Sequence, residues 1–279
     1  MSEAHVELCK KYPVPRVVYQ YLPPPEKDRD TTNILSARRF KLSQIGKMND
    51  PFDMLPVFKE VTDELVIRNH IERILKQQGD SAPITPDMIA IYKERQMQIR
   101  NNPLVHWLNH APDRRFLCLS CRDDGVLLWS HYARCHRGFA VGFRSEVLIE
   151  TEPRTNLFEV EYNDLRPEFD GTATLDEQND IRNLRALFKR KSPEWTYEQE
   201  WRAIHQPQAL IDQDFLPFTI DAVDCVIFGA LIERDVVTRL NQACTGGGLG
   251  SIPLKKARIS NKGFGLEIVP TTWIEALKV

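Results

Sequence analysis

The stretch "FLCLSCRDDGVLLWSHYARCHRGFAVGF", residues 116–143, contains the signals that determine the fold. Its first six residues are mostly apolar and typical of a short strand. Asp123 or Asp124 then provides an N-cap for a predicted helix over residues 126–136. Gly138 provides the stop that commonly ends a helix, and a second predicted strand begins there. Two strands and a helix are therefore predicted within one short stretch.

Further short strands are predicted on both sides of this centre. They are residues 16–22, 158–162, part of 192–204, 224–230, 255–260 and 265–269. Three consecutive prolines end the first of them, since proline cannot donate to a strand ladder. Helices are interspersed irregularly among the strands, which favours the α+β class over a regular βαβ array. We predict a single α+β domain over residues 1–279.

A helical insertion is predicted between about residues 56 and 111. Apolar residues recur there at three- and four-residue intervals, as on one face of a helix. Thr85 followed by Pro86 is the N-cap and first position of one such helix. A packing role is the favoured interpretation of this insertion.

Composition restricts the class of protein. The chain has 279 residues, of which 42% are hydrophobic and 27% charged, and a net charge of -2. These values are typical of a globular protein and give no global reason to expect a nucleic-acid or membrane partner. The N-terminus lacks a signal-peptide pattern, and no apolar run reaches the ~18 residues of a membrane span. We therefore expect a cytoplasmic protein whose six cysteines are reduced thiols.

Two apparent motifs are rejected at this stage. Cys118 and Cys121, followed by His131 and His136, have the residue types of a zinc site. An extended strand would point the two thiols to opposite faces, whereas a zinc knuckle needs a tight turn between them. The glycine run at residues 245–251 follows a predicted helix and precedes a strand, which is the reverse of a phosphate loop. We therefore predict no metal site.

Three separated groups of polar and aromatic residues remain as candidates for one site. They are Tyr19 and Tyr21 with Asn49 and Asp50; Trp129, Ser130, His131 and Tyr132; and Glu198, Glu200 and Arg202. No single helix or strand face explains polar and aromatic residues that lack a shared periodicity. A binding cleft lined by all three groups would explain them. We expect Tyr21, Tyr132 and Glu200 to line one concave site.

These groups also carry a resemblance. "YQY", "MNDPFD", "LLWSHYARCHRGFAVGF", "KSPEWTYEQEWR" and "CVIFGA" occur in this order in a bacterial family catalogued as a domain of unknown function. The chain resembles that family over nearly its full length. Members of such families often occur in mobile and phage-defence gene neighbourhoods, which implies a defence effector or toxin.

A more distant resemblance is to the ADP-ribosyltransferases, including the poly-ADP-ribose polymerases. It rests on the order of a strand, a helix with Ser-x-Tyr, a strand beginning with Gly, and a late strand carrying Glu. The resemblance implies a mainly antiparallel β core and NAD as substrate, without a metal. By position it implies that Tyr19 or Tyr21, with Ser130 and Tyr132, holds the nicotinamide end, and that Glu198 and Glu200 act at the ribose. The first strand offers Tyr or Gln where that superfamily generally has His or Arg.

The two glutamates have a chemical rationale of their own. Cleavage of an N-glycosidic bond passes through an oxocarbenium-like state, which a carboxylate stabilises. We expect both on one face of a strand, with Glu200 as the candidate for the ribose and Glu198 as the candidate that acts on the acceptor, which is a protein, a nucleic acid or water. Trp195, Tyr197 and Trp201 are candidate stacking surfaces for a nicotinamide or a base.

Structural interpretations compete with each of these assignments. In the simplest alternative both glutamates form exposed ion pairs worth ~0–1 kcal/mol. Glu200 then pairs with Arg202 or a cross-strand cation, and Glu198 pairs with Lys189, Arg190 or Lys191. Trp129 and Tyr132 are then core residues, and Asn49-Asp50 is only a turn. The alternative function is a non-catalytic module of a defence system that senses a nucleotide or a phage component.

Overall fold

A computed structural model of the chain describes six ranges of residues. These are 14–26, 28–105, 115–151, 156–170, 186–205 and 214–278. The chain divides into two compact units. The first is formed by residues 1–44, 113–160 and 194–279, and the second by residues 45–112 and 161–193.

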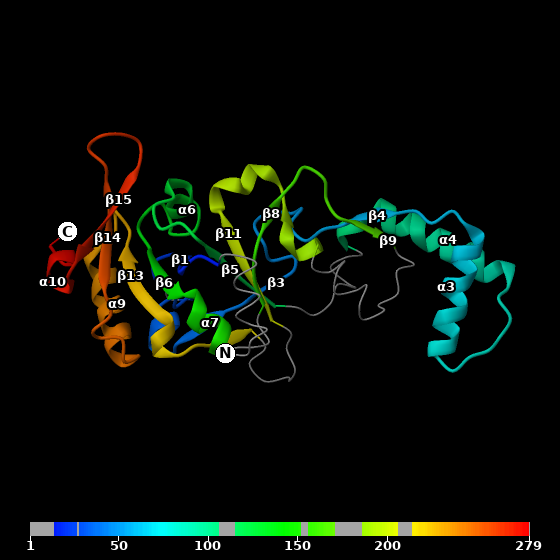
Figure 1. Cartoon of the computed structure of the whole chain (residues 1–279), viewed down its shortest axis with the longest axis horizontal. Coiled ribbons are helices and arrows are strands. Elements are labelled where there is room, and N and C mark those ends of the chain that lie inside the picture. Colours follow the sequence, from blue (N-terminus) through cyan, green and yellow to red (C-terminus); the bar gives the residue numbers. More distant parts are fainter. Residues whose placement is uncertain are drawn as a thin grey trace. The chain divides into compact units, whose positions relative to one another are not determined.

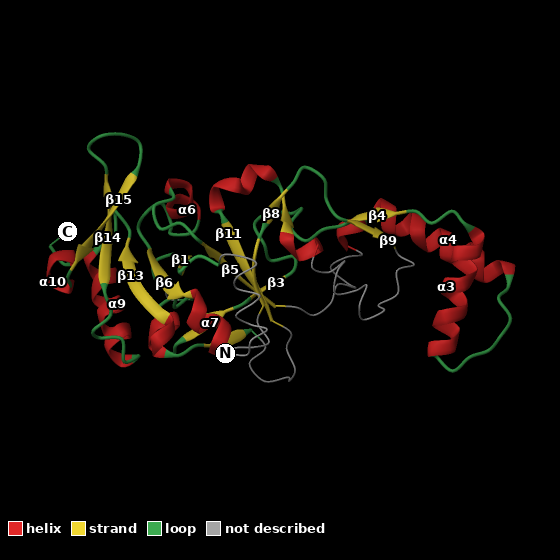
Figure 2. Ribbon diagram, in the orientation of Figure 1, coloured by secondary structure: helices red, strands yellow, loops and turns green. Residues whose placement is uncertain are grey.

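The first unit is built on a nine-stranded sheet (Figures 1 and 2). Its strands are β1 (Val17–Leu22), β3 (Ser43–Gln44), β5 (Arg115–Ser120), β6 (Phe139–Arg144), β7 (Asn156–Glu159), β11 (Glu200–His205), β13 (Val223–Phe228), β14 (Leu254–Ile259) and β15 (Leu266–Thr271). The order is β15-β14-β13-β6-β1-β5-β11-β7, and β3 pairs with β5. Only β13 and β14 run parallel among these pairs. The predicted α+β class, with a mainly antiparallel sheet, is confirmed.

The two faces of this sheet bury different kinds of side chain, because successive residues of a strand point to opposite faces. On one face, Val18 and Phe143 belong to a large apolar cluster with residues of α9 (Arg234–Gly246). On the other face, Tyr19 and Tyr21 pack in a smaller cluster with Trp129 of α6 (Val126–His131). The predicted aromatic candidates of the first strand therefore lie on the face that α6 covers.

Shorter elements complete the first unit. They are α2 (Asn33–Ser36), β2 (Arg39–Lys41), α7 (Ser145–Thr151), the 3-10 helices η1 (Pro193–Glu198) and η2 (Ile220–Ala222), β12 (Phe215–Pro217) and α10 (Trp273–Ala276). β12 and β2 form a separate two-stranded antiparallel sheet. α10 begins with a reciprocal capping box, in which the Thr272 hydroxyl accepts from the Glu275 amide and the Glu275 carboxylate accepts from the Thr272 amide.

The second unit contains the two helices expected in the insertion. α3 (Glu64–Gln77) is capped by the Asp63 carboxylate, and α4 (Pro86–Asn101) has Thr85 as its N-cap, as predicted. Residues 106–111 of the predicted insertion lie outside the described ranges. The remaining elements of this unit are β4 (Val57–Lys59), β8 (Glu161–Tyr162), β9 (Glu168–Asp170) and β10 (Arg190–Lys191), paired as β4 with β9 and β8 with β10.

The central helix is shorter than predicted. The spacing predicts a helix over residues 126–136, but α6 ends at His131. Arg134, Cys135 and His136 follow it with φ angles of 48°, 54° and 65°, so the chain leaves the right-handed helical region. Gly125, rather than either aspartate, occupies the N-cap position.

Within the described ranges, none of the helices combines the length and apolarity that a membrane crossing requires.

Candidate functional site

One row of side chains crosses the three neighbouring strands β1, β5 and β11 of the sheet. Ser120 is the register partner of both Tyr19 on β1 and Glu200 on β11. Paired residues of antiparallel strands point to the same face, so these three side chains share the face that α6 covers. The row therefore brings the first and last predicted groups of residues together on one face of one sheet.

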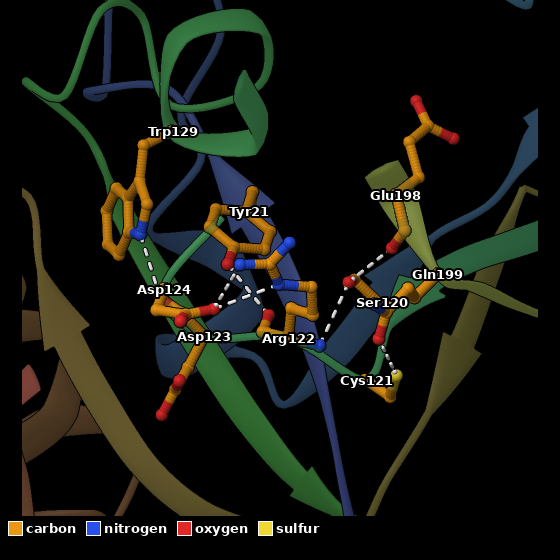
Figure 3. Close-up of polar contacts among 9 residues, drawn as sticks. All are labelled: Tyr21, Ser120, Cys121, Arg122, Asp123, Asp124, Trp129, Glu198 and Gln199. Carbon is orange, nitrogen blue, oxygen red and sulfur yellow. Dashed lines mark hydrogen bonds and ion pairs between the residues drawn. The ribbon is translucent and has the colours of Figure 1, made fainter. Parts of the chain in front are cut away.

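Ser120 fixes the chain on both of its sides. Its hydroxyl donates a 2.6 Å hydrogen bond to the Glu198 carbonyl and accepts a 3.0 Å hydrogen bond from the Arg122 amide (Figure 3). Next to it, the Cys121 thiol donates to the Gln199 side-chain oxygen at 3.1 Å. These bonds hold residues 198–199 against the end of β5. Sequence reasoning missed Ser120, for which the only signal is a polar residue at the end of an apolar strand.

Tyr21 of β1 and Trp129 of α6 form a buried aromatic pair. Their ring centroids are 5.1 Å apart, and the rings are nearly perpendicular. The Tyr21 hydroxyl donates to the Arg122 carbonyl at 2.7 Å, and the Trp129 indole donates to the Asp123 carbonyl at 2.8 Å (Figure 3). Both polar groups are thus used to fix the loop between β5 and α6. Trp129 is fully buried, as the core interpretation expects.

Tyr19 lies over a glycine and beside an acidic group. A Cβ on Gly142 would lie 2.9 Å from the Cys225 sulfur and 3.0 Å from the Tyr19 ring, so the ring needs a residue without a side chain there. Burial raises the pKa of Tyr19, and the neighbouring Asp123 carboxylate raises it further. Burial also raises the pKa of Asp123, against the opposing effect of Lys255. Sequence reasoning treated Asp123 only as a cap and missed this contact.

The turn after α6 brings a histidine back to the helix. His136 Nε2 lies 3.2 Å from the Ser130 hydroxyl oxygen. Burial lowers the pKa of His136, which favours its neutral form. The predicted candidate Ser130 therefore contacts His136, which sequence reasoning considered in the rejected zinc motif.

The two glutamates do not lie on one strand. Glu198 ends η1, Gln199 has a φ of 42°, and β11 begins only at Glu200. The positive φ turns the chain between the two carboxylates, so the expectation of a shared strand face was wrong. Pro193, in the "KSPEWTYEQEWR" sequence, is a signal for the helical turn, because Pro favours the start of a helix.

Glu198 contacts the central helix region. Tyr132, just after α6, donates its hydroxyl to Glu198 Oε1 at 2.5 Å. Glu198 is buried, with 4% of its surface exposed. A hydrogen bond to a carboxylate stabilises its charged form. This contact joins the second and third predicted groups of residues.

Glu200 instead forms a buried ion pair with Arg202. Arg202 Nε and one terminal nitrogen donate to the two Glu200 oxygens at 2.6 and 3.0 Å. Glu200 is 3% exposed and Arg202 is fully buried. The pairing matches the structural alternative in its partners, but the pair is buried where an exposed pair was expected.

Four aromatic rings follow one another from η1 to the end of α6. Ring centroids are 6.0 Å apart for Trp195 and Tyr197, 6.1 Å for Tyr197 and His131, and 6.3 Å for His131 and Tyr132. All four side chains are partly or largely exposed, unlike those of Tyr21 and Trp129. This row of four rings contacts Glu198 through the Tyr132 hydroxyl. A planar ligand can stack on rings of this kind.

The predicted candidates Asn49 and Asp50 belong to the second unit. Asp50 is buried, and its side chain accepts a 2.9 Å hydrogen bond from the Phe52 amide. This is the turn that the structural interpretation of Asn49-Asp50 expects.

Trp201, predicted as a stacking surface, is buried in the large apolar cluster on the opposite face of the sheet of the first unit.

Among the described residues, no group of three or more His, Cys, Asp or Glu side chains is arranged to hold a metal ion.

Comparison with known families adds one match. A family model described as a protein of unknown function (DUF2971) matches residues 128–203, from the middle of α6 into β11. The match includes the central and late groups of candidates, from Trp129 to Arg202, but not β1. No curated protein and no solved structure matches the chain. Over that range, the chain is similar to a family of unknown function.

Proposed function

We propose that this chain binds NAD and cleaves the bond between nicotinamide and ribose, transferring ADP-ribose to an acceptor or to water. The observation that carries the proposal is the row of four partly exposed rings that ends at the buried carboxylate of Glu198. Aromatic faces bind nicotinamide or adenine by stacking. A carboxylate held in a site with little water stabilises the positive charge that develops on the ribose.

The roles of the two glutamates differ in this proposal. Both oxygens of Glu200 are engaged by Arg202, and the pair is buried. Glu198, which accepts the Tyr132 hydroxyl at the end of the row of rings, is the residue that we assign to the ribose. Glu200 and Arg202 are positioning residues in this proposal. Their ion pair fixes the beginning of β11, and with it the neighbouring residues that include Glu198.

The reaction requires few protein groups. The bond between the ribose C1′ and the nicotinamide nitrogen breaks, and its electron pair leaves with neutral nicotinamide. An oxygen of water or of an acceptor forms the new bond to C1′ and loses its proton to solvent or to a nearby base. Glu198 stabilises the cationic state between these two events, and the rings hold the leaving nicotinamide and exclude water.

The family resemblances support the same proposal. The mainly antiparallel sheet, with β1, β5 and β11 side by side, is compatible with an ADP-ribosyltransferase-like fold. The resemblance to the bacterial family of unknown function adds a role as a defence effector or toxin to this proposal.

A second candidate function is a non-catalytic nucleotide-sensing module. It is favoured by the ion pair of Glu200 with Arg202, which withdraws one carboxylate of the "EQE" sequence from chemistry. The same aromatic row would bind the nucleotide without turnover.

Incubation with NAD and measurement of nicotinamide release tests the proposal, with cell lysate added as a source of acceptors. Release that disappears in Glu198→Gln supports catalysis. Binding of NAD by calorimetry, with no release in either condition, supports the sensor instead. Neither binding nor release would refute both functions. A matched control is Glu194→Gln, which removes an exposed carboxylate from the same 3-10 helix.

A further inference from the structure

The hairpin formed by β14 and β15 ends in a loop that extends beyond the sheet of the first unit (Figure 1). β15 is the terminal strand of that sheet, and it pairs only with β14 in the observed order. The loop between them, residues 260–265, is largely exposed. The hairpin tip is therefore accessible to a partner from several sides.

The hairpin has an excess of positive charge. Its cations are Lys255, Lys256, Arg258 and Lys262, against one acidic residue, Glu267. Glu267 is the register partner of Arg258, but its Oε1 accepts a 2.8 Å hydrogen bond from the Ser260 hydroxyl. Among the ion pairs that join described residues, none includes a cation of this hairpin. Lys255 acts on Asp123, so Lys256, Arg258 and Lys262 are the cations that remain for an anionic partner.

Two of these cations lie together on one face of the hairpin. Ala257 points into the small cluster under α6, so its neighbours Lys256 and Arg258 point to the opposite face. Residues two apart on a strand are about 7 Å apart, which is comparable to the separation of successive phosphates in an extended nucleic-acid strand. Partial burial lowers the pKa of Lys256, and the nearby Arg258 charge lowers it further.

An aromatic side chain accompanies this charge. Phe264 is 113% exposed relative to the reference value for its residue type, the highest value among the exposed large hydrophobic residues. A ring with no contact to its own protein contributes nothing to the core. Cations that track a phosphate backbone, beside an aromatic ring that stacks on a base, are the usual means of binding single-stranded nucleic acid.

We propose that this hairpin binds single-stranded nucleic acid. Lys256, Arg258 and Lys262 contact successive phosphates, and Phe264 stacks on a base. A lipid surface fits less well, because Phe264 and Ile259 provide little apolar area for membrane insertion. This binding is independent of the proposed NAD chemistry, since none of the four residues belongs to the aromatic row or to its carboxylate.

Fluorescence anisotropy with a labelled oligothymidylate of about 20 nucleotides tests this inference, since the probe exceeds the ~4–16 nucleotides that small single-strand-binding domains cover. We expect binding that weakens with salt, with a log–log slope of about -2 for three phosphate contacts. The triple variant Lys256→Gln, Arg258→Gln, Lys262→Gln should lose binding and most of the slope. Phe264→Ala should weaken binding about tenfold, and Phe264→Trp should retain it.

Two control variants make the test specific. Ile274→Ala removes a comparably exposed apolar residue from α10, and Lys93→Gln removes an exposed cation from α4; both should leave binding unchanged. The proposal is overturned if the full chain does not bind the oligonucleotide, or if the hairpin variants bind as well as the controls. Binding to anionic phosphatidylserine vesicles in preference to the oligonucleotide would overturn it too, and would assign the hairpin to a membrane. Preference for duplex over single strands contradicts the stacking role of Phe264.

Discussion

Glu198 and Glu200 are two residues apart, and the regions that hold them differ in nearly every physical respect. Glu198 ends a 3-10 helix and accepts a hydrogen bond from the Tyr132 hydroxyl, while Glu200 begins a strand and is neutralised by Arg202. Both are buried, Glu198 with a hydroxyl as a partner and Glu200 with a cation on its own strand. The difference teaches that two carboxylates of one short motif can be held by different partners from different parts of the chain.

The largest expected effect follows from breaking the ion pair between Glu200 and Arg202. Glu200→Gln leaves the fully buried Arg202 charge without its anion, and loss of one partner of a buried pair typically costs ~3–5 kcal/mol in the free energy of unfolding. Thermal unfolding should show a Tm lower by about 10 °C. The double replacement Glu200→Leu with Arg202→Met removes both charges and should recover most of the loss. An unchanged Tm in Glu200→Gln contradicts the burial of the pair.

The Glu198 side should behave in the opposite way. Glu198→Gln keeps the shape of the side chain, so Tm should change little, while kcat for nicotinamide release should fall by about 10²–10³-fold. NAD affinity should be nearly unchanged, because the rings rather than the carboxylate supply ground-state binding. Equal activity of wild type and Glu198→Gln, in a protein that does cleave NAD, would exclude the assigned role.

A milder change sharpens the comparison through the Tyr132 hydroxyl. Tyr132→Phe removes the hydrogen bond to Glu198 but keeps the ring, so kcat should fall by about tenfold, corresponding to a hydrogen bond of ~1–1.5 kcal/mol. The Glu200–Arg202 pair is untouched, so the stability loss should stay near ~1 kcal/mol. Tyr92→Phe, on α4 of the other unit, is the matched control. A kcat loss of the same size in both variants contradicts a specific role for Tyr132.

The smallest effect concerns pH and the turn that follows Tyr132. Because burial lowers the pKa of His136, the folded state binds fewer protons than the unfolded state near pH 6.5 and just below it. The contribution of His136 to stability is thus present above its unfolded pKa and decreases as pH falls through and below that value. Tm should therefore fall less between pH 7 and pH 5 in His136→Asn, whose new residue tolerates a positive φ. An identical pH dependence of Tm in the two proteins contradicts this prediction.

The sequence predicts the elements of the first unit better than it predicts the site. Strand and helix patterns around residues 116–143 are local, so β5, α6 and β6 are found from spacing alone. Alternation along β1 likewise places Val18 and Tyr19 on opposite faces. These features depend on neighbours in the chain, which is the information that a single sequence contains.

The site depends instead on contacts between distant residues. The hydrogen bond from Ser120 to the Glu198 carbonyl joins residues 78 apart, and no local pattern indicates it. The positive φ of Gln199 separates the two glutamates, although Gln is not a residue that favours such an angle. The pairing of Glu200 with Arg202 could be proposed from their spacing, but its burial follows only from the position of β11 inside the sheet, between β5 and β7.

The left-handed turn after α6 has a consequence for the order of folding. A left-handed residue costs about 1–2 kcal/mol when it is not glycine, and residues 134–136 are three in succession. The surrounding backbone is packed so tightly that a Cβ on Gly138 would lie 2.0 Å from the Leu22 carbonyl oxygen, and one on Gly229 would lie 2.1 Å from that of His136. Those contacts come from the ends of β1 and β13, so the turn is held only after both strands are in place. We therefore expect the turn to form late in folding, with substitutions in it changing the unfolding rate more than the folding rate.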